Sequence, residues 1–82
     1  MAINYEELIK NIVLPLVINP DDVVVEKFAE EEGLLSFSVK VNKADLGRVI
    51  GKNGKIANAI RTIAYAGASK EGIKVNIEFD TL

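Results

Sequence analysis

The residues best suited to bind a ligand form a short glycine loop, Gly51-Lys52-Asn53-Gly54. An apolar pattern of helical spacing follows directly, so the second glycine is expected to open a helix. Backbone N–H groups at a helix start lack partners and lie at the positive end of the helix dipole. The loop is therefore predicted to bind an anion, and its lysines indicate a phosphate.

Each residue of the loop has a predicted role. Gly51 and Gly54 tolerate positive φ and lack a Cβ, so the backbone can approach a sugar-phosphate chain closely. Lys52 contributes charge at the tip, and Asn53 contributes amide hydrogen bonds. The flanking residues are predicted to extend the site. Arg48 and Lys55 bind phosphates, Val49 and Ile50 form an apolar bed, and Asn58 and Arg61 place polar groups along the following helix.

Other phosphate-binding motifs do not fit. A Walker A loop requires four residues between its glycines and a Ser or Thr after the lysine, whereas three residues separate Gly47 from Gly51 and Asn53 follows Lys52. A G-x-G-x-x-G dinucleotide motif is also missing. Gly47 lies inside a short helix, where it is expected to permit close helix–helix packing or, alternatively, to leave space for a nucleotide.

The composition argues against catalysis. The chain of 82 residues forms one domain, residues 1–82, and its 49% hydrophobic content suffices for a core. It contains neither cysteine nor histidine, so thiolate ligands, imidazole ligands and the commonest general base are all missing. Asp45 is the single acid near the loop. We predict no catalytic residue, no metal site and no cofactor.

Charge is distributed unevenly along the chain, although the net charge is only −2. Residues 40–61 carry six cations against one anion, which makes this segment +5, and the remainder is −7. The positive charge thus gathers around the glycine loop, as a local polyanion site requires. The acidic start of the chain does not resemble a secretory leader and no apolar run is long enough to span a membrane, so we expect a soluble cytoplasmic protein.

The hydrophobic patterns predict six elements in the order α-β-β-α-α-β. A helix over 5–17, capped by Asn4 and tightened at Pro15, precedes strands over 23–29 and 35–41 that form an antiparallel hairpin. A short helix over 43–50, the loop, a long helix and a strand over 73–79 follow. The last two strands can lie parallel through a right-handed crossover. The predicted fold is an α+β two-layer domain, with three helices on one face of a three-stranded mixed sheet.

The loop and its context resemble the KH domain family. The glycine loop lies between two helices within the pattern Val-Ile-Gly-x-x-Gly-x-Ile-x-x-x-Ile, and the extra N-terminal helix and strand are similar to the bacterial (type II) arrangement. The resemblance implies that Val49, Ile50 and Ile56 form the groove beside the loop. In length and in Gly-Arg-Val-Ile-Gly-Lys-Asn-Gly-Lys-Ile-Ala, the chain resembles small stand-alone bacterial proteins of the KhpA type. The resemblance implies binding of single-stranded RNA in the cytoplasm, as a homodimer or with a larger KH-containing partner.

Two functional hypotheses follow. The first is a non-catalytic RNA-binding module, a post-transcriptional regulator or RNA chaperone, that holds a short single strand between the glycine loop and the sheet edge. In this hypothesis the exposed backbone of the strand that starts at Leu35 reads base edges. The alternative is a protein-interaction or dimerisation module with a KH-like fold and little nucleic-acid binding, which the acidic remainder and the alanine-rich helix would favour.

Overall fold

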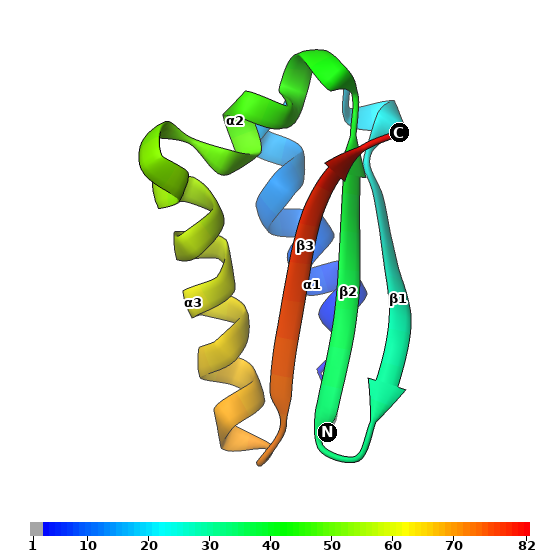
Figure 1. Cartoon of the computed structure of the whole chain (residues 1–82), viewed down its shortest axis with the longest axis vertical. Helices are drawn as coiled ribbons and strands as arrows, with labels where there is room; N and C mark the ends of the chain where they lie inside the picture. Colours follow the sequence, from blue (N-terminus) through cyan, green and yellow to red (C-terminus); the bar gives the residue numbers. More distant parts are fainter. Residues whose placement is uncertain (1–2) are drawn as a thin grey trace.

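The computed structural model describes residues 3–82, and its helices and strands follow the predicted order (Figure 1). The sheet consists of strands β1 (Val24–Glu31), β2 (Leu34–Val41) and β3 (Lys74–Thr81). The helices are α1 (Tyr5–Val13), α2 (Leu46–Ile50) and α3 (Lys55–Lys70). Four short 3-10 turns join them, at Leu14–Leu16, Pro20–Asp22, Lys43–Asp45 and Lys52–Gly54.

The strand order is β1-β2-β3, with β1 antiparallel and β3 parallel to β2. The parallel pairing confirms the predicted crossover through α2 and α3. It also corrects one expectation, because β2 is the central strand and both of its edges are paired. The Leu35 strand therefore has no free backbone for a ligand, and the open edge beside α3 belongs to β3.

The N-terminal helix begins at the predicted residue, Tyr5, but its α-helical part ends earlier than predicted. Asn4 caps α1, because its Oδ1 accepts a hydrogen bond of 3.1 Å from the backbone N–H of Glu7. The α-helix ends at Val13, and residues Leu14–Leu16 continue as a 3-10 turn around Pro15. The missing N–H of proline explains this tightening.

The first hairpin is antiparallel, as predicted, but contains one irregularity. The register of β1 against β2 shifts between Lys27 and Ala29, so Phe28 is an extra residue on an edge strand. The strand runs on to Glu31, whereas the sequence pattern placed Glu30 and Glu31 in the hairpin tip. The tip itself is shorter than predicted and contains Gly33 at φ 76°.

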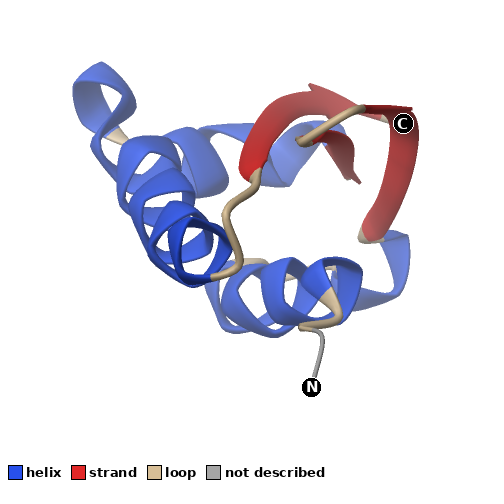
Figure 2. Cartoon of the chain, turned by 90° about the horizontal axis from the view of Figure 1, so that it is seen from below, coloured by secondary structure: helices blue, strands red, loops and turns tan. Residues whose placement is uncertain are grey.

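All helices pack on one face of the sheet, and the core lies between the two layers (Figure 2). The inward face of the sheet contributes alternate residues of β2 and β3, as the period-two pattern predicted. The largest fully buried apolar side chains come from every layer: Ile9, Val13, Val39, Val41, Val49, Ile60 and Ile77. This packing fixes α2 and α3 against β3, and so it positions the loop between them. Within residues 3–82, no helix combines the length and apolar character needed to cross a membrane.

Candidate nucleic-acid interface

The glycine loop reverses the chain between α2 and α3 through a series of left-handed backbone conformations. Gly51 has φ 74° and ψ 174°, Asn53 has φ 58°, and Gly54 has φ 76°. The Gly51 N–H closes α2 by donating to the carbonyl of Gly47 at 2.9 Å, and the Gly54 N–H donates to the carbonyl of Gly51 at 3.2 Å. These bonds form a compact turn whose tip, Lys52 and Asn53, is exposed.

Gly51 is required by packing as well as by its dihedral angles. A Cβ at this position would lie 2.6 Å from Cγ1 and 2.9 Å from Cδ1 of Ile56, which is closer than real Cβ contacts. Gly54 differs, because a Cβ there would meet only the Asn58 amide nitrogen, at 4.0 Å. The backbone at Gly51 therefore lies directly on the first turn of α3, and that contact holds the loop against the helix.

The start of α2 is held in place by the buried carboxylate of Asp45, which the sequence analysis identified only as the single acid near the loop. Asp45 is fully buried, and it accepts hydrogen bonds from the backbone N–H groups of Ile18 (3.1 Å) and Asn19 (2.9 Å) and from the Asn19 side chain (3.1 Å). Arg48 Nε lies 3.6 Å from its Oδ1. Burial alone would raise the pKa of Asp45. The hydrogen bonds from Ile18 and Asn19 and the charge of Arg48 together lower it by more, so the pKa lies below its ordinary value.

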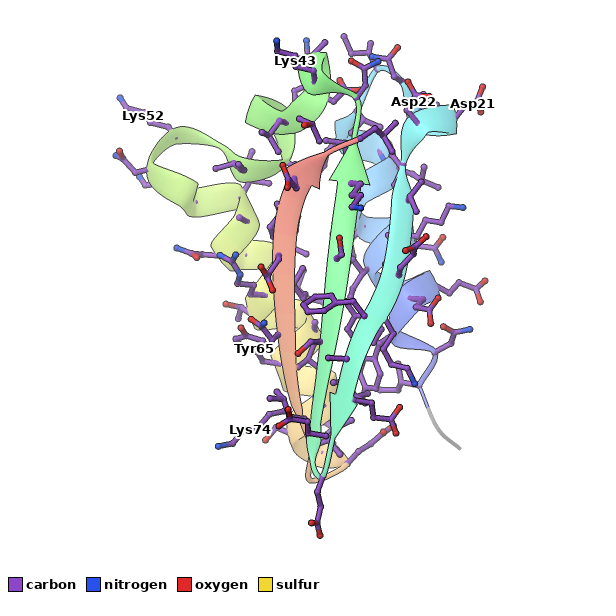
Figure 3. All side chains as sticks on the ribbon, turned by 45° about the vertical axis from the view of Figure 1, so that its right-hand side comes forward. Asp21, Asp22, Lys43, Lys52, Tyr65 and Lys74 are labelled. Carbon is purple, nitrogen blue, oxygen red and sulfur yellow. The ribbon has the colours of Figure 1, made fainter. Side chains whose placement is uncertain are left out.

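Three cations are exposed around the loop. Lys52 extends from its tip (Figure 3), Lys55 begins α3, and Arg48 lies on α2 beside Asp45. Not every cation of the predicted charge cluster lies near the loop. Lys40 lies on the outer face of the sheet, opposite the helices, in a shallow depression that it shares with Glu26, Glu78 and Asp80.

The apolar bed beside the loop is narrower than predicted. Ile50 and Ile56 are half-buried and reach the surface next to Gly51, but Val49 is 0% exposed and belongs to the core. Val49 therefore supports α2 from beneath and has no surface for a ligand. The expectation of close helix packing at Gly47 is also wrong, because a Cβ there would have no atom within 4 Å.

Asn58 and Arg61 lie together on α3, as their spacing predicted, and form a bridge to the sheet. The Arg61 guanidinium donates from Nε (3.2 Å) and Nη2 (3.1 Å) to the carbonyl of Ile77, and from Nη1 to Asn58 Oδ1 at 3.2 Å. It also lies over the Phe79 ring, 5.3 Å from the centroid. Arg61 thus joins α3 to the open edge of β3. Each of its three guanidinium nitrogens already donates a hydrogen bond, so few N–H groups remain for a phosphate.

Three exposed cations and two half-buried isoleucines lie in or next to the loop that joins α2 to α3: Arg48, Lys52 and Lys55, and Ile50 and Ile56. Among residues 3–82, no group of three or more acidic side chains could hold a metal ion. Sequence reasoning missed the anchoring role of Asp45 and the contact of Arg61 with Ile77 and Phe79, since both join segments far apart in the chain.

A family model described as the KhpA/KhpB KH domain matches residues 6–79 of the chain. The protein named RNA-binding protein KhpA from Listeria monocytogenes is 51% identical over 73 residues, covering 89% of this chain and 95% of that protein. The protein of the same name from Clostridium perfringens is 45% identical over 73 residues, covering 89% and 96%.

The fold also matches part of a larger protein of known structure. Era, crystallised with MgGDPNP and a segment of 16S ribosomal RNA, superimposes with a TM-score of 0.62 at 18% identity. The match covers 94% of this chain but only 29% of the Era chain. At this identity the likeness concerns the fold alone.

Proposed function

The chain belongs to the KhpA/KhpB family of KH domains, and from this membership we propose that it binds single-stranded RNA through the loop Gly51–Gly54. The observation that carries the proposal is the backbone of the loop, where Gly51 and Gly54 both have positive φ and carry no side chain, and the two residues between them, Lys52 and Asn53, are exposed. A bare backbone beside exposed lysines accepts a sugar-phosphate chain. The relatives from Listeria monocytogenes and Clostridium perfringens are named as RNA-binding proteins, which supports the same function.

The phosphates are proposed to lie against the loop tip, Lys52 and Asn53, and against the exposed cations Arg48 and Lys55, since the N–H groups of Gly51 and Gly54 already donate within the protein. The bases then face the groove between α3 and β3, where Ile50 and Ile56 provide apolar contact. Asn58 and the open edge of β3 supply hydrogen-bonding groups for base edges. Arg61 serves mainly to set the width of this groove, because its guanidinium is already bonded to Ile77 and Asn58.

Backbone contacts of this kind make affinity dependent on salt. Each neutralised phosphate on a single strand contributes a slope of about −0.7 in the logarithm of affinity against the logarithm of salt concentration. With three cations engaged, affinity is expected to fall roughly twentyfold between about 50 mM and about 200 mM salt.

The experiment that tests the proposal compares two charge-matched double variants by fluorescence anisotropy of a labelled single-stranded RNA. Lys52→Asp with Asn53→Asp places two carboxylates on the loop tip. Lys10→Asp with Asn11→Asp makes the same change on the exposed surface of α1. The loop variant is expected to lose binding while the α1 variant retains it, with circular dichroism unchanged in both. Equal binding by both variants would refute the role of the loop.

The partners are a further part of the proposal. The outer face of α3 exposes Ala59, Ile63 and Ala66, and we infer that a second copy, or a larger KH-containing protein, packs there in the cytoplasm. Sedimentation of the wild-type chain and of an Ala66→Glu variant tests self-association. If no RNA binds while the chain sediments as a tight dimer, the protein-interaction function replaces RNA binding.

A further inference from the structure

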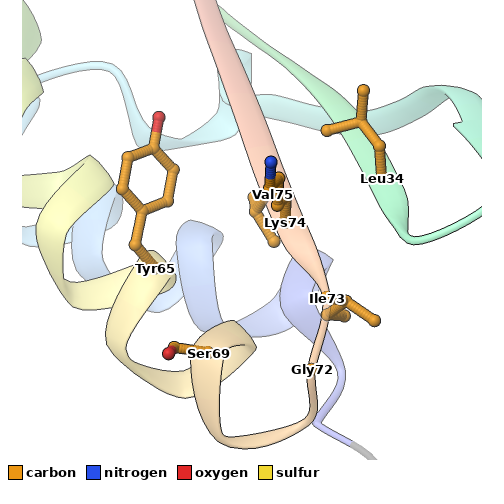
Figure 4. A pocket seen from close by; sticks show the side chains of 7 residues that line it. All are labelled: Leu34, Tyr65, Ser69, Gly72, Ile73, Lys74 and Val75. Atoms are coloured by element: carbon orange, nitrogen blue, oxygen red, sulfur yellow. The ribbon is translucent and has the colours of Figure 1, made fainter.

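A second recessed surface lies between α3 and β3, at the end of the groove remote from the glycine loop. The cleft has a volume of about 570 Å³, which is within the range of small-ligand sites. The side chains that border it come from the last turns of α3, the first residues of β3 and the start of β2 (Figure 4): Leu34, Tyr65, Ser69, Ile73, Lys74 and Val75.

Tyr65 is the exposed aromatic side chain of this cleft. It is 43% exposed, in contrast with Tyr5, which is 5% exposed and belongs to the core. It follows Arg61 by four residues and Asn58 by seven, so the three side chains share one face of α3. Figure 4 shows its ring rising from α3 on one side of the cleft, with Lys74 and Val75 on the other.

The open edge of β3 continues from the loop end of the groove into this cleft. The Lys74 N–H donates at 2.7 Å to the carbonyl of Gly33, on the β2 side of the strand. The Ile77 carbonyl instead accepts from Arg61, on the α3 side. Because the polar groups of successive residues in a strand alternate in direction, the N–H and C=O of Val75 point to the same side as those of Ile77. The cleft therefore contains hydrogen-bonding backbone groups as well as an aromatic ring.

The distance from the loop to the cleft can be spanned by a short single strand of RNA. Eleven residues of α3 separate Gly54 from Tyr65, which corresponds to about 16 Å at the helical rise. A KH loop clamps about four nucleotides. Figure 3 shows Lys52, Tyr65 and Lys74 along the same side of the molecule. A single strand that starts at the loop and follows β3 would thus arrive at Tyr65 with its next nucleotide.

We propose that the cleft between Tyr65 and Lys74 is an additional nucleotide subsite, in which the base beyond the clamped segment stacks on the Tyr65 ring. Lys74 binds the adjoining phosphate, and the backbone of Val75 offers hydrogen bonds to the base edge. The occupant is a nucleotide of the same strand, because the cleft lies on the same side of the molecule as the loop tip and has a cation, Lys74, among the residues that line it. This inference rests on the proposed RNA binding and extends it.

The test uses oligoadenylates of about four and about eight nucleotides, the shorter filling the clamp alone. Tyr65→Leu removes the ring, Tyr65→Phe retains it, and Phe28→Leu is the control for loss of an exposed aromatic side chain on β1. Since stacking of one base contributes a factor of about ten or more, Tyr65→Leu should bind the longer RNA about tenfold more weakly and the shorter one unchanged. Tyr65→Phe and Phe28→Leu should bind both as the wild type does.

A second variant tests the phosphate contact. Lys74→Ala should reduce the salt slope by about 0.7 for the longer RNA and leave the slope for the shorter one unchanged. The subsite is refuted if Tyr65→Leu binds the longer RNA normally, or if it weakens both lengths equally. It is also refuted if sedimentation shows that Tyr65→Leu dissociates a dimer of the chain. Failure of the proposed function itself is distinct, because the wild type would then bind neither length.

Discussion

Helix α3 begins and ends at turns that look alike and are built differently. Gly51, before the helix, has φ 74°, and Gly72, after it, has φ 73°. A Cβ at Gly51 would collide with Ile56, whereas a Cβ at Gly72 would have no atom within 4 Å. Gly72 therefore satisfies a backbone requirement only, while Gly51 also allows a close approach between loop and helix.

The anchors of the two ends differ in the same way. A carboxylate near each end accepts a hydrogen bond from the backbone of the N-terminal part of the chain. Asp45, which anchors α2 before the loop, is buried and accepts from Ile18 and Asn19. Glu71 is exposed and accepts from the N–H of Ile3 at 3.0 Å. The comparison indicates that the loop end of α3 is held by a buried carboxylate and by the contact of Gly51 with Ile56, whereas the other end is tied to the N-terminal segment by an exposed hydrogen bond.

The largest expected effect is that of Gly51→Ala. Positive φ strain and overpacking against Ile56 each cost about 1–3 kcal/mol, so the free energy of unfolding should fall by about 4 kcal/mol. The matched change Gly72→Ala meets only the strain of the left-handed conformation and should cost about 1–2 kcal/mol. Urea denaturation of both variants measures the difference. Equal losses would mean that the two turns are equivalent after all.

The next effect concerns the two carboxylates. Asp45→Asn replaces a charged acceptor of three hydrogen bonds, and the unfolding equilibrium constant should rise roughly a hundredfold. Glu71→Gln alters an exposed contact and should change the unfolding constant by no more than about threefold. Thermal denaturation at neutral pH compares the two. If Glu71→Gln were the more destabilising variant, the assignment of the buried anchor would be wrong.

The same anchor predicts a pH dependence. The pKa of Asp45 in the folded chain lies below its ordinary value of 3.8, so its ionised form stabilises the folded protein above that pH. This contribution is lost as the pH falls through the folded-state pKa. The stability of the wild type should therefore decline more steeply below about pH 4 than that of Asp45→Asn. Parallel profiles for the two proteins would exclude a role for this carboxylate.

The smallest effect is a gain. Gly47 lies within α2 at the base of the loop, and its surroundings have room for a Cβ. Gly47→Ala should thus raise the free energy of unfolding by about 0.5–1 kcal/mol, through helix propensity and the lost freedom of the unfolded chain. Urea denaturation tests this directly, and a loss of stability would show that this glycine, too, is constrained. RNA binding by the variant then reports whether a nucleotide uses the same space.

Local signals in the sequence were sufficient for most of the fold and for the loop. The Asn4 cap, the tightening at Pro15 and the period-two strands depend on neighbouring residues, and the structure confirms them. The spacing of Gly51 and Gly54 likewise predicted the turn between α2 and α3. The mixed sheet follows from the lengths of the connections, since two helices intervene before the last strand.

Contacts between distant segments were beyond the reach of such patterns. Asp45 accepts hydrogen bonds from Ile18 and Asn19, which lie 27 and 26 positions away, and no local sequence pattern indicates its burial. Arg61 shares a helix face with Asn58, but its main partner is the carbonyl of Ile77 on β3. The apolar character of Val49 suited a ligand bed and a core equally well. Three-dimensional packing decided between these roles.

The central claim is that the loop before α3, and not the turns elsewhere, receives the RNA backbone. The most direct measurement follows the backbone amide signals of the isotopically labelled protein by nuclear magnetic resonance during titration with single-stranded RNA. The signals of residues 51–55 and of the β3 edge should shift together, while those of Asp21 and Asp22, in the turn before β1, stay in place. Shifts confined to other surfaces, with the loop signals unmoved, would contradict the account.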